Sequence, residues 1–194
     1  LNLNNPLLKA IFEKNYKTPT AVQQKAIPLI LAKKQVIASA QTGTGKTAAF
    51  ALPILQLLFH QQDANKKQKK TRALIVSPTR ELAVQINEEF RDYSKYTKLS
   101  STVVYGGISI DAQKKALKKG VDILIATPGR LLDLCNQEII DLSSIEILVL
   151  DEADLMLDMG FIDDIKKIDL LCPNQKQILL FSATMPSKVV HFAK

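Results

Sequence analysis

The feature that most constrains the fold is a short stretch, residues 40–47, which reads Ala-Gln-Thr-Gly-Thr-Gly-Lys-Thr. An apolar run typical of a strand, residues 35–39, precedes it, and a run typical of a helix begins at Ala48. In such a strand–turn–helix unit, Gly43 and Gly45 let the backbone curl closely around an anion, and the helix N-terminus adds positive potential. The sequence therefore predicts a phosphate-binding loop.

The last two residues of this loop indicate its chemistry. Lys46 can reach the β- and γ-phosphates of a nucleotide, and the Thr47 hydroxyl can hold Mg²⁺. The general pattern begins with Gly, whereas this chain has Ala40, so an ordinary Gly- and Thr-rich turn is the alternative. The residues expected to bind the nucleotide here are Ala40, Gln41, Thr42, Gly43, Thr44, Gly45, Lys46 and Thr47.

Length and composition predict one large domain, because 194 residues with 46% hydrophobic side chains can build a full core. The net charge of +7 favours a polyanionic partner, although many basic proteins bind no nucleic acid. Cys135 and Cys172 lie far apart without metal-ligand spacing, so we expect buried thiols. No apolar run is long enough to span a membrane and no signal peptide is evident. We therefore expect a soluble, cytoplasmic, monomeric protein.

Apolar runs typical of strands alternate with runs of helical periodicity along the chain. Runs that are apolar on both faces predict an α/β fold, in which a mainly parallel sheet carries helices on both faces. Ligands of such sheets sit at the carboxyl ends of the strands. A Lys-rich segment within residues 60–72 is expected to be a solvated loop. The expected strands are 35–39, 73–76, 102–105, 122–126, 145–150 and 177–181, and the expected helices are 3–14, 21–32, 48–55, 81–94, 109–119, 130–136, 161–171 and 187–193.

Two acidic residues follow the most apolar of these strands. Asp151 comes directly after Ile147-Leu148-Val149-Leu150, the position at which a carboxylate holds Mg²⁺ together with the loop threonine. Glu152 is then placed to orient or deprotonate a water in line with the γ-phosphate. A purely structural Asp-Glu pair is the alternative.

With these residues in view, the chain resembles the DEAD-box RNA helicases over nearly its whole length, and most closely their bacterial RhlE type. The resemblance implies a RecA-like P-loop NTPase fold that uses ATP and Mg²⁺. It makes residues 1–194 a single RecA-like ATP-binding domain, with 1–32 an adenine-reading helical segment. In this family Ala is usual at the first loop position. The motifs that carry the resemblance, in family order, are 19–23, 40–47, 78–83, 106–107, 127–130, 151–154 and 182–184.

The resemblance also implies roles for residues outside the phosphate loop. The Gln23 amide suits the N6 and N7 atoms of adenine, and Tyr16 could stack on the base, whereas a helix-capping amide is the alternative for Gln23. The family usually has Gly where this chain has Asn15. Its upstream aromatic residue would fall before Leu1. The resemblance implies that Ser182 and Thr184 link the two activities, on ATP and on RNA. Their hydroxyls could bond to Asp154, and a simple turn before Pro186 is the alternative.

Single-stranded RNA is the implied polyanionic partner. Paired glycines and helix starts approach phosphates, so binding is expected to read the backbone and not the bases. Contacts to the 2′-hydroxyl would favour RNA over DNA. The alternatives are surface salt bridges for Arg80 and Arg130 and a core position for Phe161. The residues concerned are Pro78, Thr79, Arg80, Gly106, Gly107, Thr127, Arg130, Gly160 and Phe161.

The resemblance finally implies that a second RecA-like helicase domain lies outside this chain. The parent protein would then be an RNA-dependent ATPase that unwinds short duplexes, and this part alone would be nearly inactive. One rival interpretation is a non-catalytic RNA clamp, which Lys46, Asp151 and Glu152 together disfavour. Another is a small nucleotide kinase, for which no segment of lid arginines is evident.

Overall fold

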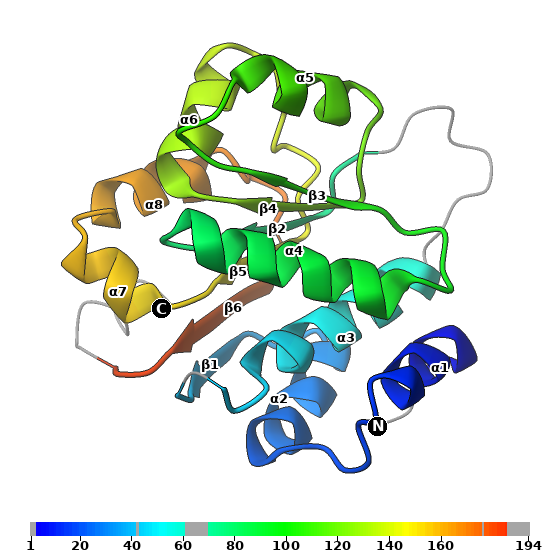
Figure 1. Cartoon of the computed structure of the whole chain (residues 1–194). Coiled ribbons are helices and arrows are strands. Elements are labelled where there is room, and N and C mark those ends of the chain that lie inside the picture. Colours follow the sequence, from blue (N-terminus) through cyan, green and yellow to red (C-terminus); the bar gives the residue numbers. More distant parts are fainter. Residues whose placement is uncertain (1–2, 42, 61–69, 176, 186–194) are drawn as a thin grey trace.

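Six parallel strands form one sheet in the computed structural model, which describes residues 3–41, 43–60, 70–175 and 177–185 (Figure 1). The strand order is β1-β6-β5-β2-β4-β3, and every described pairing is parallel. This confirms the predicted α/β class. The strands are β1 (Val36–Ser39), β2 (Ala73–Val76), β3 (Ser101–Val104), β4 (Ile123–Ala126), β5 (Ile147–Leu150) and β6 (Gln177–Ser182).

Most helices begin and end within two residues of the predicted positions, but α3 ends at His60 and not at residue 55, and one helix is additional. The short helix α7 was not predicted, because it has six residues and follows the acidic pair without a favourable capping residue. The predicted helix 187–193 and most of the Lys-rich loop lie outside the described residues. The helices are α1 (Asn5–Glu13), α2 (Ala21–Leu31), α3 (Lys46–His60), α4 (Arg80–Ser94), α5 (Ile110–Lys118), α6 (Pro128–Asn136), α7 (Ala153–Asp158) and α8 (Ile162–Leu170).

The sheet separates two hydrophobic cores, because successive side chains of a strand point to opposite faces. In β2, Ile75 packs with α2, α3 and α4, while Leu74 and Val76 pack with α6, α7 and α8. All four residues of β2, β4 and β5 are buried. This explains why these strands read as continuous apolar runs and not as alternating ones.

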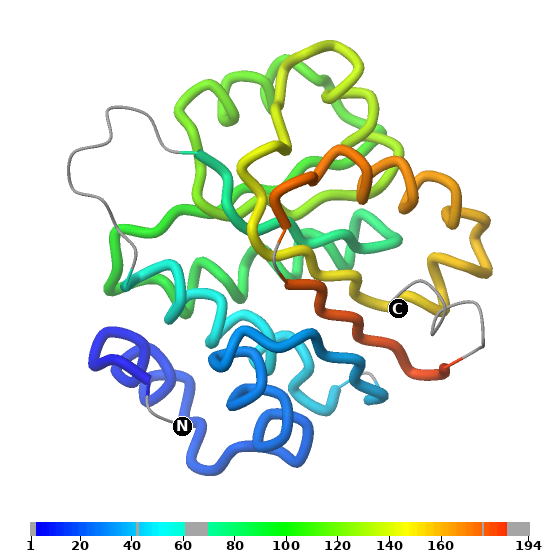
Figure 2. Tube along the Cα trace, turned by 180° about the vertical axis from the view of Figure 1, so that it is seen from behind, coloured from blue at the N-terminus to red at the C-terminus, as the bar shows by residue number. Residues whose placement is uncertain are grey.

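The strand order brings an early and a late segment of the chain together. β1 and β6 are far apart in the sequence but lie side by side, with Ser39 opposite Ser182 (Figure 2). β5 flanks β6 on its other side, with Leu150 opposite Leu180. The loop after β1 and the turn after β5 therefore leave the same edge of the sheet, one strand apart.

The two cysteines differ in burial. Cys172 is buried, whereas Cys135 is only partly buried, so the expectation of two buried thiols was wrong for Cys135. Burial raises the pKa of Cys135 to about 11 and that of Cys172 to about 12. Within the described residues, no helix combines the length and apolar character needed to cross a membrane.

Phe50 is the residue whose loss should most directly weaken the core beneath the phosphate loop. Its ring lies 5.2 Å from the ring of Phe181 in β6 and 6.2 Å from that of Phe90 in α4. We expect Phe50→Ala to lower the free energy of unfolding by about 3–5 kcal/mol through lost burial and a residual cavity. Urea denaturation measures this. Phe12→Ala is the control, because Phe12 is 80% exposed and its removal should change stability little.

Candidate functional site

The phosphate loop takes the conformation that its glycines permit. Gly43 and Gly45 have φ values of +82° and +83°, a region that other residues rarely adopt. A Cβ atom at Gly45 would also overlap the Gln23 amide, so a side chain there would displace that amide from its bond to the Gly45 carbonyl. Helix α3 begins at Lys46, directly after the loop. Thr42 lies outside the described residues.

A cavity of about 210 Å³ joins this loop to the acidic pair. Lys46 and Thr47 line it from the start of α3, and Asp151 and Glu152 line it from the end of β5. Ala40, Gln41 and Thr44 do not line it. The remaining lining residues are Tyr16, Gly43, Gly45, Ala48, Leu82, Gln85, Ile86 and Glu89.

Helix α4 supplies four of those lining residues, and the sequence analysis missed all of them. Leu82, Gln85, Ile86 and Glu89 recur at helical spacing, so one face of α4 forms a wall of the cavity. In the sequence this spacing is indistinguishable from that of any core-facing helix. Only the packing of α4 against α3 reveals the contribution.

Lys46 and Glu152 form a buried ion pair across the cavity. Lys46 Nζ lies 2.5 Å from Glu152 Oε1, and the two side chains are 6% and 11% exposed. Burying either charge alone would be very costly, so the pair satisfies both. Glu152 also has a left-handed backbone, with φ 52° and ψ 51°, which costs a residue with a side chain roughly 1–3 kcal/mol.

Asp151 is buried with one carboxylate oxygen unused. Its Oδ1 atom has no hydrogen-bond partner among the described residues. Burial raises the pKa of Asp151 to about 7, the nearby Lys46 ammonium lowers it, and the Glu152 carboxylate raises it further. A buried carboxylate oxygen without a partner, in the same cavity as the Thr47 side chain, has the chemistry of an incomplete site for a hard cation.

Gln23 is held by the protein at both ends of its amide. Its Oε1 accepts a hydrogen bond from the Thr20 backbone N–H at 3.0 Å, and its Nε2 donates to the Gly45 carbonyl at 3.1 Å. The first bond is the helix-capping role that the sequence analysis gave as the alternative. The second bond ties the start of α2 to the phosphate loop.

Tyr16 stands at the mouth of the same cavity, where its side chain is 44% exposed. Its hydroxyl lies 3.3 Å from that of Tyr93 in α4. The preceding Asn15 has a φ of +57°, the left-handed conformation that ends α1. Asn is, after Gly, among the residues best suited to this conformation, so the departure from the family's glycine keeps the backbone path.

Asp154 joins the turn after β5 to the end of β6. Its Oδ2 accepts hydrogen bonds from both the backbone N–H and the hydroxyl of Thr184, each at 2.8 Å. The Ser182 hydroxyl accepts a bond from the Asp154 backbone N–H at 3.0 Å. Partial burial raises the pKa of Asp154, but the bonds from Thr184 and Ser182 outweigh it and lower the pKa to about 2.

A second, more open hollow of about 460 Å³ collects most residues expected to bind RNA. Arg130 is held by a bond from its Nη2 to the Ile108 carbonyl, and its buried Nη1 has no partner among the described residues. Thr79, Gly107 and Gly160 do not line the hollow, and Thr79 instead caps α4 through the Leu82 N–H. The lining residues are Pro78, Arg80, Gly106, Thr127, Gly129, Arg130, Asp133 and Phe161.

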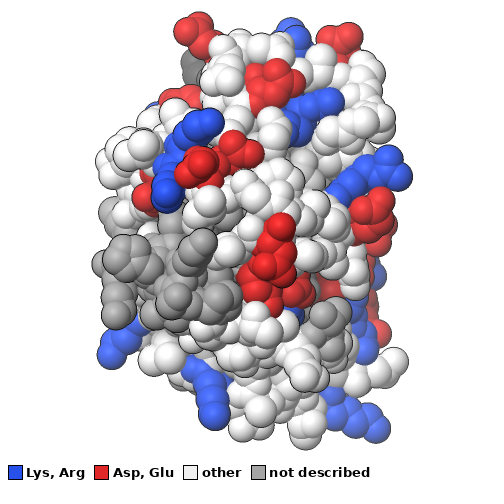
Figure 3. All heavy atoms as spheres, turned by 90° about the vertical axis from the view of Figure 1, so that its left-hand side faces the viewer, with Lys and Arg blue, Asp and Glu red and all other residues white. Residues whose placement is uncertain are grey.

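The charges on the side of the molecule that carries α7 and α8 are mixed. Figure 3 shows basic and acidic side chains interspersed on this face and not gathered into one basic patch. Arg80 itself lies 3.4 Å from the Glu81 carboxylate, with both side chains more than half exposed. Exposed pairs of this kind are worth about 0–1 kcal/mol, so Arg80 can exchange this partner for a phosphate at little cost.

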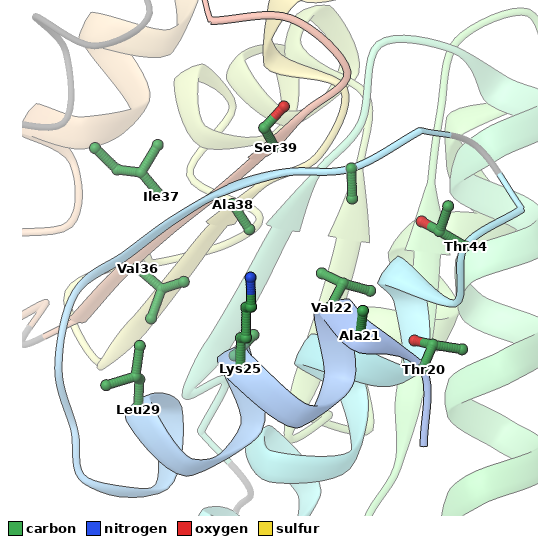
Figure 4. Close-up of a pocket in the computed structure, with 12 residues that line it drawn as sticks. Thr20, Ala21, Val22, Lys25, Leu29, Val36, Ile37, Ala38, Ser39 and Thr44 are labelled. Atoms are coloured by element: carbon green, nitrogen blue, oxygen red, sulfur yellow. The ribbon is translucent and has the colours of Figure 1, made fainter. Parts of the chain in front are cut away.

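The largest of these three hollows, about 730 Å³, lies between α2 and the edge strand β1, and Ala40 and Thr44 of the phosphate loop border it (Figure 4). Leu29 of α2 and Val36 of β1 face each other across it, and Lys25 reaches toward β1. Its lining is mainly apolar and contains no acidic residue. Volume alone would favour this hollow, but the smaller cavity has the lysine, the threonine and both acids, so we assign the site there.

Comparison with known proteins gives consistent matches over the whole chain. The family model described as "DEAD/DEAH box helicase" matches residues 20–192. The DEAD-box ATP-dependent RNA helicase RhpA of Helicobacter pylori is 47% identical over 193 residues, which is 100% of this chain and 38% of RhpA. CshA of Bacillus subtilis, also a DEAD-box ATP-dependent RNA helicase, is 44% identical over 100% of this chain and 38% of its own length.

A solved structure gives the same result. The crystal structure of a DEAD box protein from Methanococcus jannaschii superposes with a TM-score of 0.91 and 43% identity, over 100% of this chain and 51% of that one. This chain thus spans about two fifths of the curated bacterial relatives and half of that solved chain. The RhlE type stays a prediction.

The bonds to Asp154 predict a pH-dependent contribution to stability. Because the folded-state pKa of about 2 lies below the ordinary value of 3.8, this contribution is present above about pH 4 and is lost as the pH falls toward 2. We expect Asp154→Asn to destabilise the protein by about 1 kcal/mol at pH 7, with the deficit shrinking between about pH 4 and 2. Urea unfolding at several pH values measures it.

Asp158→Asn is the matched control, because Asp158 is exposed at the other end of α7. It should leave stability nearly unchanged at every pH. A deficit of Asp154→Asn that is constant across the pH range would show that its carboxylate charge is not what Thr184 stabilises.

Proposed function

Because this chain belongs to the DEAD/DEAH box helicase family, we propose that it is the ATP-binding part of an RNA-dependent ATPase that separates short RNA duplexes. The observation that carries this proposal is the convergence of Lys46, Thr47, Asp151 and Glu152 on one cavity, from two strand ends separated by β6. Curated relatives named as ATP-dependent RNA helicases support it. Those relatives are longer, so a second helicase domain would complete the protein.

The cavity suits the triphosphate and its metal. Gly43, Gly45 and the start of α3 provide backbone N–H groups for phosphate oxygens, and Lys46 provides the mobile positive charge. Mg²⁺ would be held by Asp151 and Thr47, and the unpartnered Oδ1 of Asp151 fits this assignment. When bound, the ion neutralises charge that develops on the phosphates during transfer.

The ion pair between Lys46 and Glu152 suggests how binding prepares catalysis. Without nucleotide, Glu152 holds the lysine and is not available to a water molecule. When Lys46 turns to the β- and γ-phosphates, the Glu152 carboxylate is released beside them. It can then orient and deprotonate the attacking water, which we propose as its catalytic role.

RNA would lie over the open hollow that Arg80 and Arg130 line. The helix starts at α4 and α6 and the backbone at Gly106 face the same hollow, so the contacts would be to phosphates and sugars. Such contacts bind RNA independently of its sequence. The bonds that Thr184 donates to Asp154, and that Asp154 donates to Ser182, link β6 to the turn that carries the acids, a suitable route for coupling the two sites.

The role of Glu152 can be tested in the full-length protein. Glu152→Gln keeps the size of the side chain but removes its basicity, so we expect ATP turnover to fall by about 10²-fold or more while ATP binding persists. Steady-state phosphate release and equilibrium titration measure the two effects. Glu88→Gln, an exposed position of α4, is the control. Normal turnover by Glu152→Gln would show that another group handles the water.

Recognition of adenine by Gln23 can be tested separately from its capping of α2. If its amide reads adenine, Gln23→Ala should reduce the preference for ATP over GTP by about tenfold, the value of one well-made hydrogen bond. If it only caps α2, stability should fall and the preference should not change. Calorimetric titration with both nucleotides decides between these. Gln24→Ala is the control, because Gln24 bonds to the Pro19 carbonyl on the exposed side of α2.

A further inference from the structure

One face of α4 carries a hydrogen-bonded pair that the proposed reaction does not yet use. Tyr93 is fully buried, and its hydroxyl donates to Glu89 Oε2 at 3.0 Å from the next turn of the helix. Because the Tyr93 hydrogen is directed to Glu89, the Tyr16 hydroxyl at 3.3 Å is the donor in its own contact with Tyr93. The bonds therefore run in one direction, from Tyr16 through Tyr93 to Glu89.

Glu89 faces the metal end of the proposed nucleotide site. It lines the cavity together with Lys46, Thr47, Asp151 and Glu152. Thr47 and Glu89 border this cavity from α3 and α4, and Glu89 is close enough to Asp151 for their charges to interact. Burial raises the pKa of Glu89, while the bond from Tyr93 favours its charged form. Glu89 is thus a third carboxylate of this cavity.

A carboxylate beside the Thr47 hydroxyl can orient that hydroxyl toward a cation. A threonine hydroxyl has one hydrogen and two lone pairs, so it can donate to Glu89 and still direct a lone pair at a cation. An anionic acceptor fixes that orientation and makes the oxygen a better ligand. Outer carboxylates of this kind typically change metal affinity by about 10–100-fold when they are removed.

We propose that Glu89 is a positioning residue for Mg²⁺: its carboxylate accepts the Thr47 hydrogen and so turns the Thr47 oxygen toward the metal. Tyr93 donates a hydrogen bond that fixes the Glu89 carboxylate, and the buried Tyr93 ring packs against the ring of Tyr16. The inference rests on the proposed nucleotide site. It adds to that site two residues of α4 that touch neither the nucleotide nor the metal.

A purely structural role would have a different signature. α4 also bonds to α1 through Lys14 and Asp92, at 2.5 Å, so Glu89 and Tyr93 could simply help to fasten the two helices. In that case their removal would lower stability and weaken nucleotide binding equally with and without metal. A positioning role changes only the part of the binding that depends on Mg²⁺.

The test measures ADP binding to the full-length protein by calorimetry, once with excess Mg²⁺ and once with EDTA. Glu89→Gln removes one negative charge from the cavity, so the affinity for metal-free ADP should be kept or increased. The gain in affinity on adding Mg²⁺ should shrink by about tenfold, because Thr47 loses its anionic acceptor. Tyr93→Phe keeps the ring and should shrink the gain in the same direction by a smaller factor.

Two matched controls separate these effects from general ones. Glu88→Gln removes a charge from the exposed side of the same helix, and Tyr96→Phe removes a hydroxyl that bonds to Glu13 away from the cavity. Both should keep the wild-type gain. If Glu89→Gln and Tyr93→Phe also keep it, or lose affinity equally in both conditions, the inference is overturned. If the wild-type protein shows no gain from Mg²⁺, the proposed metal site itself fails.

Discussion

The ion pair between Lys46 and Glu152 is the interaction on which the arrangement of the site depends. It joins the loop after β1 to the turn after β5 and passes over the end of β6, which lies between them in the sheet. A buried lysine without a partner would pull water into the cavity or lose its proton. The pair instead keeps a positive charge inside the site, ready for an anion that can compete with Glu152.

Several unfavourable features meet at this edge of the sheet. Two glycines with positive φ, the left-handed Glu152 and the unpartnered oxygen of Asp151 all lie around the same cavity. The rest of the chain compensates through two hydrophobic cores and fully buried central strands. Strain and unsatisfied polar atoms persist only where the surrounding structure holds them, and a bound ligand can relieve the second of these.

Helix α4 connects the parts of the site that the sequence motifs treat separately. Its N-terminus, with Thr79 as its cap and Arg80 as its first residue, borders the open hollow. Its middle, with Glu89, forms a wall of the phosphate cavity, and Tyr93 near its end contacts Tyr16. A rigid helix that touches all three regions gives a physical path by which RNA, metal and base could influence one another.

The sequence by itself determined most of what depends on neighbours along the chain. The phosphate loop follows from a strand, two glycines and a lysine in order, and the parallel sheet follows from apolar runs that alternate with helices. The acids at the end of β5 were predicted for the same reason, since a strand end is a local feature. Asn15 was noted as a departure, and its left-handed backbone shows that the local requirement is still met.

Only the tertiary structure decided which distant residues meet. The place of β6 between β1 and β5, the bond from Gln23 to the Gly45 carbonyl and the place of Glu89 in the cavity that Thr47 lines join segments that the sequence separates by more than twenty residues. No local pattern distinguishes Glu89 from Glu88 beside it. The difference arises because helix packing fixes the rotation of α4, and that rotation is set by the apolar contacts of the whole core.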